Sequence, residues 1–277
     1  MKKSFGQHLL VDKNHQKKII DSMNLKPDET VLEIGSGTGI MTCLLSEKVK
    51  KVFAVEVERN VLKTLKENIS ANKVENVEII ESDFLKLDIE KLITQSFKIF
   101  GNIPYNITSK ILLKIFGEID FPASHLLSFK DVYLMMQLEV AQRLVAKPST
   151  KEYSPLTLLI QYFSEPKILF KVPKGSFNPS PKVDSAFVSF IRKETLPRAK
   201  DMKLLKDIIR ISFQQRRKNI SNSLDKLFND KQKIKLVLEK IGLKENLRAE
   251  NLTLEDFIKL ADEFYATAFK DNPIPLN

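Results

Sequence analysis

The four residues Asn102-Ile103-Pro104-Tyr105 carry the clearest chemical signal in this chain, and a run of strand-forming residues, 97–100, leads into them. An Asn-x-Pro-Tyr turn at the end of a strand presents an amide oxygen, a backbone carbonyl and an aromatic face together. Hydrogen bonds from an amino group to the Asn102 oxygen and the Pro104 carbonyl would free the nitrogen lone pair, while Tyr105 stacks on the base that carries it. A lone turn of this kind would more simply cap a strand. Its position here favours methyl transfer to the amino group of a flat base.

A second signal is the segment EIGSGTG at residues 33–39, which follows a short run of strand residues and precedes a helical pattern. The chain has 8 glycines, and three of them are Gly35, Gly37 and Gly39. Such a turn brings backbone N–H groups close to a ligand. Because Ile40 stands where the dinucleotide fingerprint has its third glycine, binding of NAD fits poorly.

Two acidic residues follow the next two strands of the predicted sheet. Glu56 could accept hydrogen bonds from both hydroxyls of a ribose, and Asp83 could accept one from an adenine amino group. Either residue alone could equally be a solvated acid at a strand end. Together with the glycine turn they predict an adenosyl-containing ligand along the carboxyl edge of the sheet.

Alternating strand and helix patterns predict the fold. Strands are expected at residues 30–34, 51–55, 77–80, 97–100, 132–136, 167–172 and 184–192, with helices at 11–25, 40–49, 60–72, 88–94, 108–116, 139–145 and 154–163. This alternation predicts an α/β domain with a doubly wound, mostly parallel, Rossmann-like sheet over residues 1–193. After a linker near 194–198, helical patterns at 202–213, 218–228, 231–241 and 253–269 predict a smaller all-helical domain over 199–277.

Charge and composition limit the function classes. The formal net charge is +10, and residues 198–248 hold 15 Lys and Arg against 6 Asp and Glu, so the basic character is concentrated in the predicted helical domain. This favours nucleic-acid binding over a merely solvated surface. Cys43 is the single cysteine, which excludes an intrachain disulfide and a thiolate metal cluster. With no apolar run near the ~18 residues of a membrane span, and a motif beginning at Phe5 that leaves no room for a targeting peptide, we expect a cytoplasmic protein.

Three further groups of residues admit more than one interpretation. Phe177, in a proline-spaced loop, could form the second wall of a base sandwich or could equally pack onto the core. Arg216, Arg217 and Lys218 suit a phosphate backbone, although basic clusters are often solvated. His8, in a polar loop before a helix, is more typical of a structural hydrogen bond than of a catalyst.

Taken together, these segments closely resemble the ribosomal RNA adenine N6,N6-dimethyltransferases, and within them the small-subunit enzyme of ribosome biogenesis. The resemblance extends from Lys3 to about Leu260 and rests on FGQHLL at 5–10, EIGSGTG at 33–39, NIPYNITS at 102–109, FNPSPKVDSA at 177–186 and FQQRRKNISNSL at 213–224. It implies an RNA-binding methyltransferase that takes S-adenosyl-L-methionine, without a metal. The substrate would be two adjacent adenosines of small-subunit RNA in a pre-ribosomal particle. No obligate protein partner is expected, and the protein is predicted to be a monomer.

The resemblance also implies roles for individual residues. Cofactor contacts fall on His8, Leu10, Gly35, Gly37, Glu56, Asp83 and Asn102. Asn102, Pro104, Tyr105 and Phe177 form the catalytic group, in which Tyr105 and Phe177 stack on the base.

Three alternatives remain open at this point. Ile103 replaces a leucine typical of the biogenesis enzyme and is usual in the large-subunit enzymes that give macrolide resistance, although the FGQ opening and the basic cluster favour the small-subunit enzyme. A DNA adenine methyltransferase would flip its target out of a duplex, but the full-length resemblance disfavours it. A non-catalytic assembly or transcription factor on the same fold would tolerate loss of the site residues, which are all present.

Overall fold

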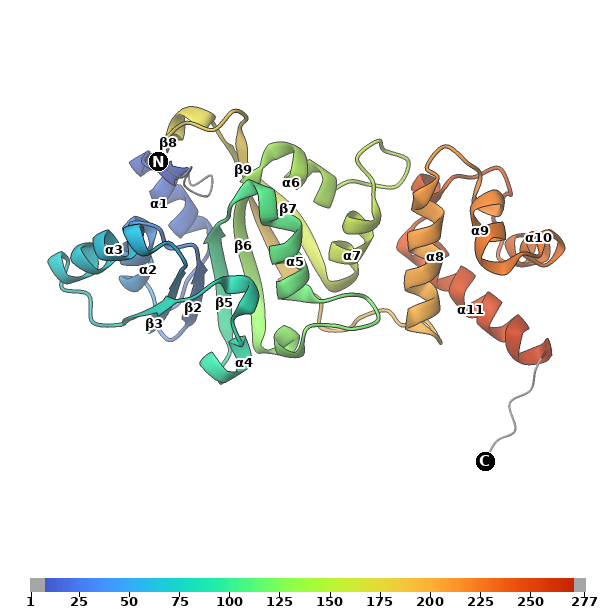
Figure 1. The fold of residues 1–277 in the computed structure, drawn as a ribbon, viewed down its shortest axis with the longest axis horizontal. Helices are drawn as coiled ribbons and strands as arrows, with labels where there is room; N and C mark the ends of the chain where they lie inside the picture. The colour runs from blue at the N-terminus through green and yellow to red at the C-terminus, as the bar shows by residue number, and fades with distance from the viewer. Residues whose placement is uncertain (1–7, 272–277) are drawn as a thin grey trace. The chain divides into compact units, whose positions relative to one another are not determined.

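The computed structural model describes residues 8–271, which divide into two compact units. The first consists of residues 8–117, Ala123–Gln142 and Ser164–Lys193, and the second of Glu118–Pro122, Arg143–Phe163 and 194–271. Figure 1 shows the strands in the first unit and the helices α8 to α11 in the second. A single boundary at residues 193–199, as predicted, therefore describes only part of this division, because the segments 118–122 and 143–163 also lie in the second unit.

The structure places the secondary-structure elements close to their predicted positions. The strands are β1 (Leu9–Leu10), β2 (Thr30–Ile34), β3 (Lys51–Glu56), β4 (Val77–Glu81), β5 (Phe97–Asn102), β6 (Phe129–Gln137), β7 (Ser164–Val172), β8 (Phe177–Asn178) and β9 (Ser185–Arg192). The helices are α1 (Lys13–Ser22), α2 (Ile40–Ser46), α3 (Arg59–Ala71), α4 (Ile89–Leu92), α5 (Thr108–Phe116), α6 (Leu138–Leu144), α7 (Pro155–Phe163), α8 (Met202–Gln214), α9 (Ile220–Phe228), α10 (Lys231–Lys240) and α11 (Leu254–Asp271). The short strands β1 and β8 were not predicted.

One seven-stranded sheet forms the centre of the first unit, with the strand order β4-β3-β2-β5-β6-β9-β7. The five strands from β4 to β6 pair in parallel, whereas β9 runs antiparallel to both of its neighbours. The predicted doubly wound, Rossmann-like sheet is thus confirmed. The strand order reverses between β2 and β5, and an open sheet of this kind binds ligands in the crevice at such a point.

Apolar side chains cover both faces of this sheet. Helix α1 and its C-cap Met23 place Ile19, Ile20 and Met23 in the same buried cluster as Phe100 and Phe187 of the sheet. Because neighbouring strand residues point to opposite faces, the residues that alternate with these cover the other side. There the ring of Phe116 in α5 lies 5.8 Å from that of Phe129 and 6.0 Å from that of Phe190.

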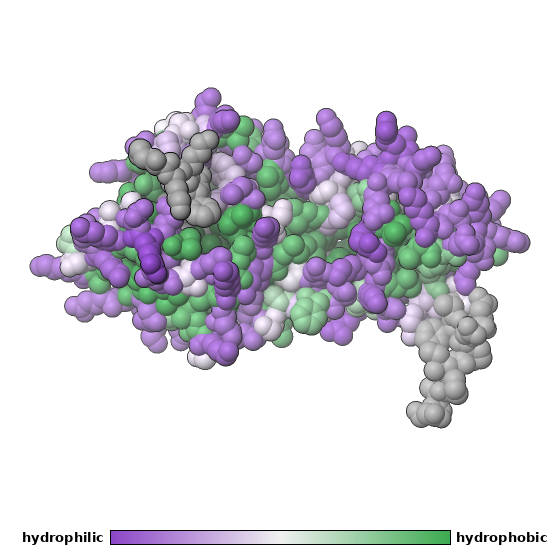
Figure 2. All heavy atoms as spheres, in the orientation of Figure 1, coloured by the Kyte–Doolittle hydropathy of each residue, from purple (hydrophilic) through white to green (hydrophobic). Residues whose placement is uncertain are grey.

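The second unit is helical and has a core of its own. Rings from three segments pack in a row, with 6.2 Å between the centroids of Tyr153 and Phe213 and 6.1 Å between those of Phe213 and Phe257. The N-terminus of α11 is capped, because Thr253 and Asp256 exchange hydrogen bonds between side chain and backbone. On the face that Figure 2 shows, the surface over α9 and α10 is largely hydrophilic. Within the described residues, no helix is long and apolar enough to span a membrane.

Candidate active site

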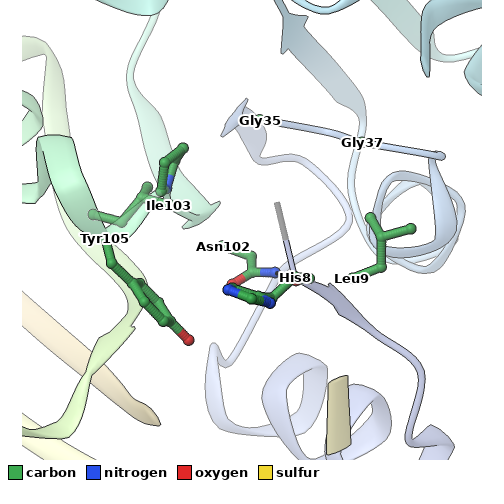
Figure 3. A pocket seen from close by; sticks show the side chains of 8 residues that line it. His8, Leu9, Gly35, Gly37, Asn102, Ile103 and Tyr105 are labelled. Carbon is green, nitrogen blue, oxygen red and sulfur yellow. Dashed lines mark hydrogen bonds between the residues drawn. The ribbon is translucent and has the colours of Figure 1, made fainter. Parts of the chain in front are cut away.

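The glycine turn and the Asn102 turn meet at the point where the strand order reverses. Ile34, the last residue of β2, lies opposite Gly101 of β5, so the segments that follow these two strands leave the sheet side by side. A Cβ atom on Gly101 would lie 3.0 Å from the Ile34 carbonyl oxygen, so a side chain here would press against the backbone of β2. The pocket found here is lined by His8, Leu9, Gly35, Gly37, Asn102, Ile103, Pro104 and Tyr105. Figure 3 shows Asn102 and His8 between Tyr105 on one side and Leu9 with the glycine turn on the other.

The glycine turn has a backbone conformation that residues other than glycine rarely adopt. Gly35, Gly37 and Gly39 have φ angles of +71°, +55° and +86°. At Gly39 an added Cβ would also lie 2.6 Å from the end of the Leu65 side chain in α3. The sequence thus uses glycines for two reasons, a left-handed backbone and close packing beneath the turn.

The two strand-end acids lie at neighbouring positions on the carboxyl edge. The Glu56 carboxylate, 2% exposed, accepts hydrogen bonds from the backbone N–H groups of Gly37, Val57 and Glu58 at 2.8, 2.8 and 2.9 Å. Asp83 caps a short 3-10 helix through one oxygen, which accepts from Leu85 at 3.0 Å. A ribose at Glu56 would therefore share this carboxylate with the backbone that shapes the turn.

Glu33, at the start of the glycine segment, is 2% exposed and accepts a hydrogen bond of 2.6 Å from the Thr42 hydroxyl of α2. Burial raises the pKa of this carboxyl to about 7, and the nearby Glu56 charge acts in the same direction. The carboxyl is thus protonated in a large fraction of molecules near neutral pH.

The orientation of the Asn102 amide is fixed by the backbone of a distant segment. Its Nδ2 donates a hydrogen bond of 2.8 Å to the carbonyl oxygen of His8. Because a carbonyl can only accept, this bond assigns the nitrogen and leaves Oδ1 as the accepting atom of the side chain. Among the described residues, Oδ1 has no hydrogen-bond partner, which is the state required of an acceptor for a substrate amino group.

Pro104 and Tyr105 complete the turn. The Pro104 carbonyl, which we predicted to accept from the target amino group, already accepts long hydrogen bonds from the Ile107 N–H at 3.3 Å and from the Thr108 hydroxyl at 3.4 Å. The Tyr105 ring lies 5.6 Å from the His8 ring, and its hydroxyl lies 2.5 Å from the hydroxyl of Ser185. Burial raises the pKa of the Tyr105 phenol, so it remains neutral at physiological pH.

Four of the residues predicted to bind the cofactor or to act in catalysis do not line the pocket, namely Leu10, Glu56, Asp83 and Phe177. Leu10 is 5% exposed and packs in the core, because β1 alternates and turns the side chain of Leu9 toward the pocket instead. Phe177 pairs with Leu10 across β1 and β8, is 4% exposed and belongs to the same core cluster. Of the two interpretations of Phe177, the structure supports packing onto the core.

The loop before α1 reaches the pocket through His8. Its ring Nδ1 lies 2.7 Å from the carbonyl oxygen of Pro179 and so donates to it, which ties the pocket wall to the loop after β8. The residues Ser4 to Gln7 of the same motif lie outside the described residues.

All three residues of the basic cluster are exposed, but Arg216 is also bonded within the helical unit. The Arg216 guanidinium donates to the carbonyl oxygens of Lys151 and Tyr153 at 2.8 and 3.1 Å and pairs with the Glu250 carboxylate at 3.2 Å. It therefore holds segments of the helical unit together, a role that the sequence did not indicate. Arg217 and Lys218 are exposed.

This arrangement combines a glycine turn, strand-end acids, a fixed amide acceptor and an aromatic ring at one sheet edge.

Comparison with known proteins also indicates methyl transfer to adenine. The family model described as ribosomal RNA adenine dimethylase matches residues 1–266. The chain is 38% identical over 266 residues to ribosomal RNA small subunit methyltransferase A of Fusobacterium nucleatum, covering 95% of this chain and 97% of that one. It is 37% identical to the protein of that name from Ligilactobacillus salivarius, covering 94% and 89%.

Two solved structures are similar over nearly the whole chain. A dimethyladenosine transferase from Plasmodium falciparum matches with a TM-score of 0.77 and 28% identity, covering 94% of this chain and 98% of that one. The 23S rRNA methyltransferase ErmE matches with a TM-score of 0.69 and 25% identity, covering 92% and 98%. From the extent of the family match and of these relatives, the chain belongs to the ribosomal RNA adenine dimethylase family.

Proposed function

We propose that this protein transfers methyl groups from S-adenosylmethionine to the N6 amino groups of two adjacent adenosines in small-subunit ribosomal RNA, producing N6,N6-dimethyladenosine during ribosome assembly. The observation that carries the proposal is the Asn102 amide, whose nitrogen is held by the His8 carbonyl so that its oxygen is available to a substrate amino group. The relatives named above as small-subunit methyltransferases support the choice of RNA.

The residues present fit an adenosyl cofactor. Gly35 and Gly37 form one wall without side chains, and Glu56 offers a carboxylate to ribose hydroxyls. Asp83 Oδ2 has no hydrogen-bond partner among the described residues, so it can accept from an adenine amino group. When bound, S-adenosylmethionine supplies the methyl group from its sulfonium.

The chain's own residues act on the amino group of the target adenine. The nitrogen lone pair of such a group is delocalised into the ring, which makes it a poor nucleophile. Hydrogen bonds to Asn102 Oδ1 and to the Pro104 carbonyl favour a tetrahedral nitrogen and return the lone pair to it. No base is needed beforehand, since the proton becomes acidic only once the nitrogen carries positive charge. The Tyr105 face stacks on the base and favours that charge, so catalysis depends largely on placement.

We assign cofactor binding and catalysis to the unit that contains the sheet, and contact with the RNA backbone to the helical unit. Arg217 and Lys218 are exposed cations near the start of α9 and are suited to phosphates. Arg216 supports them indirectly, through its bonds within the helical unit.

We further propose that the protein acts in the cytoplasm, as a monomer, on a pre-ribosomal particle. The absence of a membrane-spanning helix among the described residues is compatible with this.

The test offers labelled S-adenosylmethionine with two alternative substrates, unmethylated small subunits and protein-free large-subunit RNA. Label in the small-subunit RNA alone is the expected result. Label in the large-subunit RNA alone would instead indicate methylation of 23S rRNA, the function that the name of ErmE states. Cofactor binding without label in either RNA would indicate an assembly factor on the same fold and would refute the proposal.

A further inference from the structure

Ser185 is a buried hydroxyl beside the pocket to which neither the motif analysis nor the mechanism gave a role. It is the first residue of β9 and is 0% exposed. Its Oγ lies 2.5 Å from the phenolic oxygen of Tyr105, the residue on which the target base stacks. This distance lies at the short end of the range for O–H···O hydrogen bonds.

The two partners of this bond are held with very different rigidity. Ser185 is paired on both sides, opposite Gln137 of β6 and opposite Val172 of β7. A backbone fixed between two strands cannot shift without breaking a sheet ladder. Tyr105 instead begins a single 3-10 turn directly after Pro104, where the local hydrogen bonds measure 3.2 to 3.4 Å.

The ring of Tyr105 therefore depends on its far end for its position. Its hydroxyl is bonded to the sheet, and its other ring contact is the tilted His8 imidazole at 5.6 Å. Without the Ser185 oxygen, the ring would keep its area but lose the bond that sets its plane and depth. A stacked adenine would then place its amino group less accurately against Asn102, and a small misplacement of reacting atoms is costly to rate.

We propose that Ser185 is a positioning residue for the methyl transfer, which holds the Tyr105 ring in place so that the target amino group meets Asn102 and the cofactor methyl. This inference rests on the proposed function. It concerns a residue that touches neither substrate nor cofactor, and it makes Tyr105 and Ser185 one functional unit.

The experiment compares Ser185→Ala, Tyr105→Phe and the double variant, with methyl transfer to unmethylated small subunits as the assay. Each single variant removes one half of the same hydrogen bond and keeps the stacking ring. Loss of a hydrogen bond worth about 1.4 kcal/mol in the transition state slows a reaction about tenfold. Each single variant should therefore lower kcat about tenfold, whereas KM for the subunits and Kd for the cofactor should stay within twofold of the wild-type values. The double variant should be no slower than either single variant, because the bond is already lost.

Ser189→Ala is the matched control, since Ser189 is a buried serine on the same strand whose hydroxyl makes only a long bond of 3.5 Å to the Lys167 carbonyl. Ser189→Ala should leave kcat unchanged. It also measures the general effect of losing a buried hydroxyl from β9, which Ser185→Ala shares. If Ser185→Ala does not fold, Tyr105→Phe tests the same bond from the partly exposed side.

The results separate the inference from the function beneath it. The positioning role alone would be overturned if the wild type is active and Ser185→Ala has the same kcat. It would also be overturned if the losses of the two single variants multiply in the double variant. A wild-type protein inactive on small subunits would overturn the proposed function, and the inference with it.

Discussion

Glu33 allows a quantitative prediction, because its carboxyl is buried beneath the glycine turn and has a pKa raised to about 7 from an ordinary value of 4.5. Burial is the main cause, and the neighbouring Glu56 charge adds to it. A carboxyl whose pKa is raised by folding contributes most stability below the unfolded pKa. That contribution is lost as the pH rises from about 4.5 through 7.

The magnitude follows from the gap between the two pKa values. At 1.36 kcal/mol for each unit of pKa, the full effect is about 3 kcal/mol, and most of it falls between pH 5 and pH 8. Glu33→Gln removes the titrating proton while keeping the shape and a partner for Thr42. The free energy of unfolding of the variant minus that of the wild type should therefore rise by roughly 2–3 kcal/mol from pH 5 to pH 8.

The assay is urea unfolding of both proteins at several pH values, in which the other titrating groups cancel from the difference. Glu75→Gln serves as the control, because it removes a carboxylate from an exposed position and measures the effect of one lost charge. Thr42→Val should act in the opposite direction to Glu33→Gln. It removes the hydrogen bond that favours the ionised carboxylate and so destabilises more at pH 8 than at pH 5. A difference between Glu33→Gln and wild type that stays constant with pH would refute this reasoning.

Three other predictions test the site, the helical unit and the sheet. Asn102→Ala should lower kcat for methyl transfer by about 10²- to 10³-fold, the typical effect of losing one hydrogen-bonding group aimed at developing charge, with RNA binding retained in a filter assay; near-normal transfer would exclude the amide as the activating group. The double variant Arg217→Ala, Lys218→Ala should weaken RNA binding and flatten its dependence on salt. Arg216→Ala should mainly lower the melting temperature measured by circular dichroism, because the Arg216 guanidinium bonds the backbone of the helical unit. Equal effects of all three substitutions on the salt dependence of binding would contradict this division. Gly101→Ala should destabilise the protein by about 1–3 kcal/mol in urea unfolding, since the new Cβ would lie 3.0 Å from a backbone oxygen of β2; an unchanged midpoint would show that the two strands can separate there.

Much of the fold was predictable because long patterns determine it. The strand Thr30–Ile34 and the helix Thr108–Phe116 lie where the sequence placed them, since apolar periodicity and the following turn residues agree. The strands β1 and β8 were missed because each has two residues and exists only through a pairing such as Leu9 with Asn178, far apart in the chain. No local pattern encodes such a pairing.

The candidate site was predictable where chemistry depends on residue type, and not where it depends on contacts. Asn102, the glycine turn and the strand-end acids could be placed because the carboxyl ends of parallel strands share one edge. The His8 carbonyl that orients Asn102 leaves no signal in the sequence, since every residue has a carbonyl. Arg216 and Phe177 were assigned from their types, but their partners, backbone carbonyls for one and the core for the other, became visible only in three dimensions.

The most direct measurement of the central claim is mass analysis of nucleosides from unmethylated small subunits incubated with the purified protein and S-adenosylmethionine. The account predicts N6,N6-dimethyladenosine from the wild type and almost none from Asn102→Ala. Methyl groups on a carbon of adenine or on another base would contradict it, as would equal yields of dimethyladenosine from the two proteins.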